Sequence, residues 1–206
     1  LSLILDRIHS VYVLNYVAKC GDASTSSKSN SKFQGATVID AQKGFHCEDP
    51  VVCLDFASLY PSIIRWKNLC YTTYIIPNSS SNSDSDYLNI QGVMYEKFEV
   101  TPGVFETFGR RPGQKGVLSM IEEDLGNART KTKKLMKTEE DPKVLQLLNS
   151  KQLAQKVTMN SLYGFCGTAK GCLPLVAIAA AVTATGRAMI NKTANFIRRD
   201  MGGTVI

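Results

Sequence analysis

Apolar residues in the second half of the chain recur at the spacing of amphipathic helices. Between Val117 and Met136 they fall at positions 117/118, 121, 125, 128 and 135/136, which places them on one helical face. A polar break at residues 141–143 follows, and helical spacing returns from about Lys143 to Tyr163 and again from Leu175 to Ile197. The pattern predicts two antiparallel helices that leave and rejoin the body of the protein, followed by a third helix.

The first half of the chain alternates extended apolar runs with turns. Residues 35–40 (GATVID) and 50–56 (PVVCLDF) predict two strands, the second a continuous apolar run of the buried type. Residues 58–66 predict a short helix or turn directly after the second strand. The final residues, 201–206 (MGGTVI), predict a turn that enters a further strand.

Polar stretches separate these elements. Residues 1–20 predict an amphipathic helix that ends near Gly21, and residues 22–32 predict a polar linker. Residues 78–86 (NSSSNSDSD) predict a second flexible insertion. The expected layout is therefore two strands, a long helical excursion, a further helix and a return to the sheet.

Charge is the feature of the composition that changes this picture. The 206 residues carry a formal net charge of +6, with 44% hydrophobic and 20% charged residues, a composition typical of globular proteins. Residues 110–170 hold twelve Lys or Arg against six Asp or Glu, so this one segment matches the excess of the whole chain. A localised positive charge favours binding of phosphate groups.

Neither a zinc site, a disulfide framework nor a membrane segment is indicated. The six cysteines form no C-x-x-C pair, and neither His9 nor His46 completes a zinc pattern, so we expect free thiols, with Cys53 and Cys70 buried. The most apolar run, residues 173–186, has 14 residues, fewer than the roughly 20 needed to cross a bilayer. We therefore expect no membrane insertion.

The segment DFASLYPSII, residues 55–64, carries the first candidate chemistry. Asp55 closes the predicted buried strand, where a carboxylate is costly unless a charge such as a divalent cation compensates it. Nucleotidyl transfer uses such a site, because two Mg²⁺ ions bridge the attacking and leaving oxygens, and the amides of the turn that follows could cradle a triphosphate. A structural role, in which Asp55 caps the helix that begins near Ser58, explains the segment equally well.

The segment KVTMNSLYGF, residues 156–165, places a cation, an amide and an aromatic ring on one helical face. Lys156 and Asn160 are four positions apart, and Tyr163 returns near the same face. Such a face could hold a phosphate together with a base or sugar, and Gly164 would allow a ligand or backbone to approach closely. The structural alternative is a solvated helix end with Tyr163 in the core.

The segment NARTKTKKLMK, residues 127–137, holds five Lys or Arg and no acidic residue. Arg129 and Lys133 lie one helical turn apart and present two cations along one stripe. Charge runs of this kind are usually solvated helix faces. The local excess of positive charge around this segment nevertheless favours phosphate binding.

Together these three segments resemble the family B DNA polymerases. The first palm motif of that family, D-x-x-S-L-Y-P-S, and its fingers motif, K-x-x-x-N-S-x-Y-G, are both intact and in order, 101 positions apart. The flanking segments 65–75 and 167–190 are most similar to the herpesvirus-type polymerases. The motif residues are Asp55, Ser58, Leu59, Tyr60, Pro61 and Ser62 in the first motif and Lys156, Asn160, Ser161, Tyr163 and Gly164 in the second.

The resemblance implies roles for the first motif in catalysis and nucleotide binding. By similarity, Asp55 would bind the two catalytic Mg²⁺ ions through its carboxylate, and the Phe56 carbonyl would add a ligand. The backbone of Ser58, Leu59 and Tyr60 would contact the triphosphate. The Tyr60 ring would also pack under the incoming sugar and clash with a 2′-hydroxyl, which selects deoxynucleotides sterically.

The resemblance implies that the fingers grip the triphosphate and check the new base pair. Pre-formed cations suit a reaction whose catalysis is mainly positioning and charge stabilisation. Tyr163 and Gly164 would lie against the nascent base pair and test its shape. The side chains implied at the triphosphate are Arg129, Lys133, Lys156 and Asn160, with Gln152 as a supporting contact.

The implied fold is α+β: a partial polymerase palm, an antiparallel sheet with packed helices, plus an antiparallel helical fingers hairpin. The expected units are residues 1–34 (helix and linker), 35–114 (first part of the palm), 115–165 (fingers) and 166–206 (second part of the palm). No D-x-D pair, the third motif of the family, occurs after residue 200. We therefore expect the second metal carboxylate to lie outside this chain and the fragment alone to be inactive.

The implied activity is template-directed DNA synthesis from dNTPs on a primer–template duplex, with a processivity factor bound through a C-terminal region that this chain lacks. A herpesvirus-type origin would imply work in the host cell nucleus; any other origin implies an intracellular protein that is not secreted. The alternative from another class is a catalytically dead, polymerase-derived DNA-binding subunit. A protein-primed polymerase fits less well, because the stretch between the motifs is short.

Overall fold

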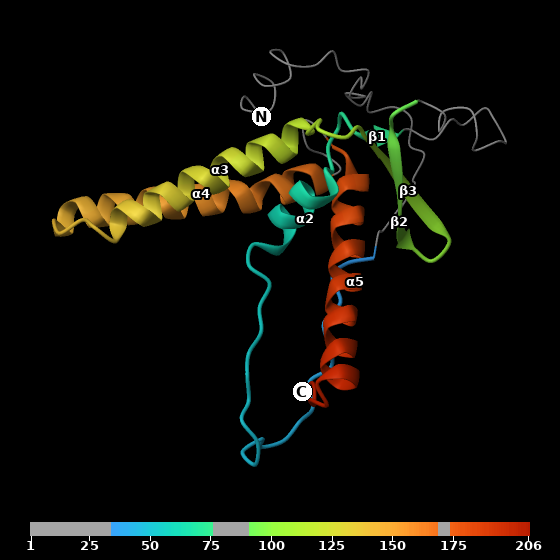
Figure 1. The fold of residues 1–206 in the computed structure, drawn as a ribbon, viewed down its shortest axis with the longest axis horizontal. Helices are drawn as coiled ribbons and strands as arrows, with labels where there is room; N and C mark the ends of the chain where they lie inside the picture. Colours follow the sequence, from blue (N-terminus) through green and yellow to red (C-terminus); the bar gives the residue numbers. More distant parts are fainter. Residues whose placement is uncertain (1–33, 76–90, 169–173) are drawn as a thin grey trace.

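The computed structural model describes residues 34–75, 91–168 and 174–206. Four helices and a small sheet form an α+β fold in which helices α3 and α4 extend as a long arm from the rest of the molecule (Figure 1). We call this pair of helices the arm. The elements are α2 (Leu59–Lys67), β1 (Tyr74–Ile75), β2 (Met94–Thr101), β3 (Val104–Arg110), α3 (Val117–Met136), α4 (Pro142–Gly167) and α5 (Val176–Asp200).

The helices predicted from apolar spacing are confirmed. Helix α3 has the predicted bounds, and α4 and α5 begin within one residue of their predicted starts. Helix α4 begins at Pro142 because proline suits the first helical position and the Asp141 side chain accepts a hydrogen bond from the Lys143 amide at 2.8 Å. The predicted short helix after residue 58 is α2.

The sheet has three antiparallel strands in the order β1-β3-β2, and sequence analysis missed all three. Its centre is a hairpin between β2 and β3 that turns at Pro102 and Gly103, where Gly103 adopts a positive φ of 77°. The Pro-Gly pair between two alternating runs was the available signal. The Phe98 and Phe108 rings lie edge to face, 5.7 Å apart, and anchor the hairpin to the core.

The strands predicted at residues 35–40 and 50–56, and the strand predicted to begin within residues 201–206, are wrong. These segments are extended but carry no strand pairing. Val51, Val52 and Leu54 are 60%, 75% and 69% exposed, and Cys53, predicted to be buried, is exposed too. An apolar run becomes a strand only when a neighbouring strand satisfies its backbone, and no described segment pairs with these.

Several expectations concern residues outside the described ranges. The helix expected at 1–20, the linker at 22–32 and the insertion at 78–86 lie outside the described residues. Within them, Cys47, Cys53, Cys70 and Cys166 are free thiols. No described helix combines the length and the hydropathy that crossing a membrane requires. The domain boundaries expected from the sequence stay predictions.

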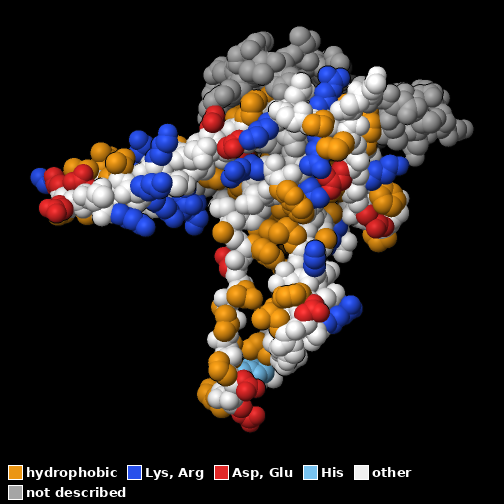
Figure 2. Space-filling model, viewed as in Figure 1, with side chains coloured by type: hydrophobic (Ala, Val, Ile, Leu, Met, Phe, Trp, Pro, Cys, Tyr) orange, Lys and Arg blue, Asp and Glu red, His pale blue; other side chains and the backbone are white. Residues whose placement is uncertain are grey.

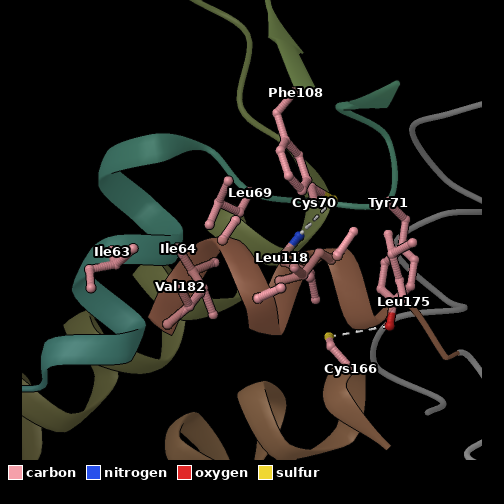
Figure 3. Close-up of a cluster of buried hydrophobic side chains, with 14 of the residues drawn as sticks. Ile63, Ile64, Leu69, Cys70, Tyr71, Phe108, Leu118, Cys166, Leu175 and Val182 are labelled. Atoms are coloured by element: carbon pink, nitrogen blue, oxygen red, sulfur yellow. Dashed lines mark hydrogen bonds between the residues drawn. The ribbon is translucent and has the colours of Figure 1, made fainter. Parts of the chain in front are cut away.

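The core lies where α2, α3, α5 and the sheet meet (Figure 3). Ile63 and Ile64 of α2 are 1% exposed, and Val182 of α5 is fully buried. Small alanines along the first half of α5, at 177 and 179–181, let this helix approach its neighbours closely. Burying these side chains supplies the hydrophobic stabilisation that fixes the base of the arm.

The end of α2 and the start of α3 are joined by a buried set of hydrogen bonds, which we call the α2–α3 joint. Asn68 accepts a hydrogen bond from the Gly116 amide at 2.7 Å and donates to the Gln114 carbonyl at 3.1 Å. The Cys70 thiol lies 3.4 Å from the Leu118 amide, which donates to it (Figure 3). The Ser119 hydroxyl donates to the Ile64 carbonyl at 3.0 Å.

One buried carboxyl stands out beside this joint. Glu122 of α3 is fully buried, and both of its carboxyl oxygens lack a hydrogen-bond partner among the described residues. Burial raises the pKa of the Glu122 carboxyl to about 7, against the opposing attraction of Arg65. The folded protein therefore holds this proton far more tightly than the unfolded chain does.

We expect the Glu122 carboxyl to make the stability of the chain fall as pH rises from about 4.5 to about 8. Over that range the unfolded state loses its proton before the folded state does, so stability decreases with pH. The shift corresponds to about 3 kcal/mol, and we expect about 2 kcal/mol after solvent screening. Denaturant unfolding of the wild type and of Glu122→Leu at pH 5 and pH 8 measures the difference.

The neighbouring Glu123 provides the matched control for this prediction. Its pKa is lowered by Lys115, which donates a hydrogen bond to it, so Glu123 is already ionised throughout the pH range. Glu123→Gln should keep the pH dependence of the wild type, whereas Glu122→Leu should remove it. An unchanged pH dependence in Glu122→Leu would show that Glu122 titrates normally in the fold.

Candidate active site

Two tyrosines from distant parts of the chain meet at the base of the arm. Tyr60 lies in the first turn of α2, and Tyr163 lies in the last two turns of α4. Their ring centroids are 4.5 Å apart and the ring planes are tilted by 38°. Both rings are half-buried and pack against the core. The structure thus brings the two sequence motifs into direct contact.

The Tyr163 phenol is held in its neutral form. Burial, and next the neighbouring Tyr60, raises the pKa of Tyr163 above its usual value. The ring of Tyr163 therefore presents an uncharged surface at physiological pH. The structural alternative, in which Tyr163 belongs to the core, accounts for only part of the ring, because the ring is partly exposed.

Asp55 and Phe56 lie in the extended segment that leads into α2. The Asp55 side chain is exposed, so the expectation that it ends a buried strand is wrong. An exposed carboxylate needs no compensating cation, and the argument for a metal from burial alone does not hold. The cap role also gains no support, because Ser58 occupies the cap position of α2 and makes no side-chain cap bond.

Ser58 and Leu59 form the turn that places Tyr60. Ser58 adopts a left-handed conformation with φ 49° and ψ 52°, which is uncommon for a residue other than glycine. Its carbonyl accepts the first backbone hydrogen bond of α2, from the Ser62 amide at 2.9 Å. This turn changes the chain direction between Asp55 and the helix. Strained backbone of this kind is concentrated at functional sites.

Contacts between α3 and α4 set the register of the arm. The Arg129 side chain donates to Gln152 at 3.3 Å, and Thr132 donates to Gln155 at 3.3 Å. Nearer the base of the arm, the Met159 methyl lies close to Gly126. Because the two helices are antiparallel, the pairing of Gly126 with Met159 places Lys156 near the level of Arg129 along the arm.

Three of the expected phosphate-binding side chains point into solvent. Lys133, Lys156 and Asn160 are exposed, and Lys and Arg side chains gather along the arm (Figure 2). Lys156, Asn160 and Tyr163 follow one another on one face of α4. That face runs from the cations of the arm to the Tyr60–Tyr163 contact.

Gly164 is exposed next to Tyr163, in the interior of α4. A Cβ atom added at this position would meet no atom within 4 Å. The described protein therefore gives no packing reason for glycine here, although glycine weakens a helix. A requirement for glycine at position 164 would therefore have to come from a group outside the described residues, such as a bound ligand.

The described residues alone do not form a metal site. They contain no group of three or more His, Cys, Asp or Glu that could hold a metal ion. The structure joins Tyr60 with Tyr163 and Arg129 with Gln152, and in the described ranges no contact links Asp55 to either pair. Sequence reasoning also missed Asn68, for which the only signal was an asparagine directly after a predicted helix.

Comparison with known proteins adds to this geometry. Residues 3–205 match the family model described as DNA polymerase family B. The DNA polymerase delta catalytic subunit of Candida albicans is 41% identical over 173 residues, which cover 84% of this chain and 16% of that protein. The DNA polymerase catalytic subunit of Rhesus cytomegalovirus (strain 68-1) is 37% identical over 180 residues, 87% of this chain and 16% of that protein.

The fold is similar to that of a solved polymerase. The family B DNA polymerase from the hyperthermophilic archaeon Pyrobaculum calidifontis matches with a TM-score of 0.57 and 27% identity, over 82% of this chain and 20% of that one. The chain spans about a sixth of the length of the Candida albicans and cytomegalovirus polymerases. On the match over almost its whole length, the chain belongs to DNA polymerase family B.

Proposed function

We propose that this chain forms part of the catalytic core of a DNA-directed DNA polymerase, which transfers deoxynucleotides from dNTPs to a primer 3′-hydroxyl under the direction of a template. The observation that carries the proposal is the Tyr60–Tyr163 contact. It brings the two segments that carry the family B motifs together at one point, and Lys156 lies on the same face of α4 as Tyr163. Family membership supports the same activity.

The metal expected for this reaction is Mg²⁺. Asp55 and the Phe56 carbonyl offer hard oxygen ligands on an exposed segment, and Mg²⁺ is commonly held by one or two carboxylates together with water and substrate phosphates. The residues present therefore fit one side of such a site, and in our proposal the second carboxylate comes from outside this chain. When bound, two Mg²⁺ ions would stabilise the attacking and leaving oxygens of the phosphoryl transfer.

Tyr60 would select the sugar. The Tyr60 ring contacts the Tyr163 ring and also packs against the hydrophobic core. These two contacts would prevent it from moving aside to admit a bulkier sugar. A rigid ring rejects a 2′-hydroxyl by steric exclusion without a hydrogen bond. The backbone of Ser58, Leu59 and Tyr60, at the start of α2, would contact the triphosphate.

The arm would hold the triphosphate. Arg129 and Lys133 of α3 and Lys156 of α4 are cations on the same stretch of the arm. Asn160 lies one turn after Lys156 on the same face of α4, toward Tyr163. Gln152 would orient the Arg129 guanidinium through the hydrogen bond between them. Phosphoryl transfer depends mainly on positioning and on stabilisation of developing charge, which cations set in this way provide.

Tyr163 and Gly164 would face the nascent base pair. The neutral Tyr163 ring offers a flat surface to a base, and the open space at Gly164 leaves room for the pair to approach α4. This arrangement would test the shape of a base pair, while the template supplies the sequence. Primer–template DNA would therefore be the macromolecular ligand of this face.

Partners and location extend the proposal beyond the described residues. A processivity factor would bind the complete polymerase through a C-terminal region. A herpesvirus-type origin would place the protein in the host nucleus, and the cytomegalovirus polymerase is 37% identical to this chain. The delta-type relatives from Candida albicans and Glycine max are 41% and 38% identical, so identity alone does not separate the two subgroups.

We expect Asp55→Asn in the full-length protein to lower the rate of primer extension by about a thousandfold or more, because a neutral amide binds Mg²⁺ weakly. Affinity for primer–template DNA should stay within about threefold of the wild type. Asp49→Asn, in the same exposed segment, is the matched control and should extend primers normally. Steady-state extension and fluorescence anisotropy measure the two quantities.

The wild type itself distinguishes this proposal from the alternative of a dead polymerase-derived subunit. A wild-type protein that binds primer–template DNA but does not extend it would overturn the proposed activity. Equal extension rates for Asp55→Asn and the wild type would remove Asp55 from the metal site and leave the family assignment intact.

We expect Gly164→Ala to stabilise α4 by about 0.5–1 kcal/mol and yet to reduce nucleotide incorporation. The added methyl group meets no protein atom, so a loss of activity would report its contact with the bound nucleotide or base pair. Thermal unfolding and the KM for dNTP measure the two effects. Activity that is unchanged or rises together with stability would show that no ligand fills this space.

A further inference from the structure

We propose that Asn68 is a positioning residue of the nucleotide site, which fixes the helix that carries Tyr60 relative to the helix that carries Arg129 and Lys133. This inference rests on the proposed function, since it assigns a consequence for nucleotide selection. It is carried by the α2–α3 joint, a buried set of contacts that lies away from the site itself.

Asn68 lies at the end of α2, where its side chain bridges to the start of α3. It is the C-cap residue of α2 and only 8% exposed, and its left-handed backbone (φ 54°, ψ 42°) lets the next amide, that of Leu69, donate to the Ile64 carbonyl at 3.0 Å. Its side chain then uses both polar atoms, accepting from Gly116 and donating to Gln114. A buried amide with both ends satisfied is rigid, because each lost bond would leave an unpaired group.

The joint supplies the cap that α3 lacks. Gly116, the N-cap residue of α3, has no side chain, and no side-chain cap bond is made locally. Hydrogen-bond acceptors for this end of the helix come from α2 and the segment after it: Asn68 for the Gly116 amide and the Cys70 thiol for the Leu118 amide. The start of α3 is therefore defined by the end of α2.

The joint leaves no room for the helices to slide. A Cβ atom at Gly116 would lie 2.5 Å from the Cys70 Cβ and 3.3 Å from the Asn68 Oδ1. Ser119 adds a second link, since its hydroxyl donates to the Ile64 carbonyl inside α2. The start of α3 can pivot at this point only if the contacts of Asn68 are broken.

Small rotations at the joint become large displacements in the arm. Arg129 lies thirteen residues after Gly116, or about 20 Å along a helix that rises 1.5 Å per residue. A tilt of about 5° at the joint would move Arg129 by about 2 Å, and a misplacement of about 1 Å can lower a rate roughly a hundredfold. The joint therefore controls whether the triphosphate can bind Arg129 and Lys133 while the sugar of the same nucleotide lies against Tyr60.

Tyr60 lies at the other end of the same short helix. In the described ranges, only Ser58 and Asn68 combine a side chain larger than hydrogen with positive φ, and they bound α2 on both sides. The helix is thus held in a fixed orientation between two uncommon turns. If α2 shifts against α3, the Tyr60 ring moves away from a sugar whose triphosphate is held by the arm, and the steric check on the 2′-hydroxyl weakens.

Asn68→Gly in the full-length polymerase tests the inference. Glycine keeps the left-handed backbone at this position without strain and removes only the side-chain contacts. We expect the KM for dNTP to rise about tenfold and the preference for dNTP over the matching ribonucleotide to fall about tenfold, after correction for the active fraction by active-site titration. Asn68→Asp retains the acceptor but not the donor to Gln114, and should give a smaller change in the same direction.

Ala194→Gly is the control for a loss of stability alone. Ala194 is buried in the second half of α5, away from the joint, and glycine there weakens the helix. A purely structural role for Asn68 would lower the active fraction in both variants and leave the dNTP preference unchanged. Sugar preference and KM within twofold of the wild type in Asn68→Gly and Asn68→Asp would overturn the inference.

A distance measurement separates the inference from the proposed function. Spin labels at Asn191 of α5 and Lys131 of α3, both exposed, report the orientation of the arm against the rest of the fold. We expect a broader distance distribution in Asn68→Gly than in the wild type, and an unchanged width would overturn the joint whatever the activity. A wild type that incorporates no nucleotide would instead overturn the proposed function, and with it the assignment of Asn68 to sugar selection.

Discussion

The arm depends on one constraint, the unsatisfied amides at the start of α3. A helix begins with backbone N–H groups that have no partner within the helix, and here the cap residue is a glycine. The partners come from a segment almost fifty residues earlier, where Asn68 and the Cys70 thiol accept bonds from Gly116 and Leu118. In other helices a short polar side chain at the N-cap accepts a hydrogen bond from these amides. Here the acceptors belong to another segment, and they therefore fix the angle between α2 and the arm.

Helices and strands differed in how far sequence could predict them. The apolar spacing of residues 117–136 indicates a helix whose hydrogen bonds, apart from those at its first amides, are made within the segment, so the pattern could predict α3 without knowledge of its neighbours. The run at 50–56 has equally clear apolar spacing, but a strand needs a partner that its own sequence does not encode, and the described fold provides none. The hairpin of β2 and β3 was missed because neither strand alternates strictly: Glu96 and Lys97 are adjacent in β2, and Val104 and Phe105 are adjacent in β3.

The candidate site shows the same division. Motif residues could be named from sequence because their types and spacing are specific, yet only the fold shows that Tyr60 meets Tyr163 and that Gln152 binds Arg129. The expectation for Asp55 rested on burial and on the family motif, and its exposure removes the first reason and leaves the second. Asn68 was beyond sequence reasoning because its role depends on Gly116 and Gln114, forty-six and more positions away.

Under the proposed function, flexible and rigid groups would have separate tasks, the first in affinity for the triphosphate and the second in selection of the sugar. The cations of the arm are long side chains in solvent, which would attract phosphates over a range of positions and tolerate small errors of placement. Tyr60 is held by the core and by a neighbouring ring, so it can discriminate only if its distance from the triphosphate is fixed. That distance is set neither by the cations nor by the ring. In our proposal it is set by the backbone between them, which packs closely at the joint of Asn68 and Gly116.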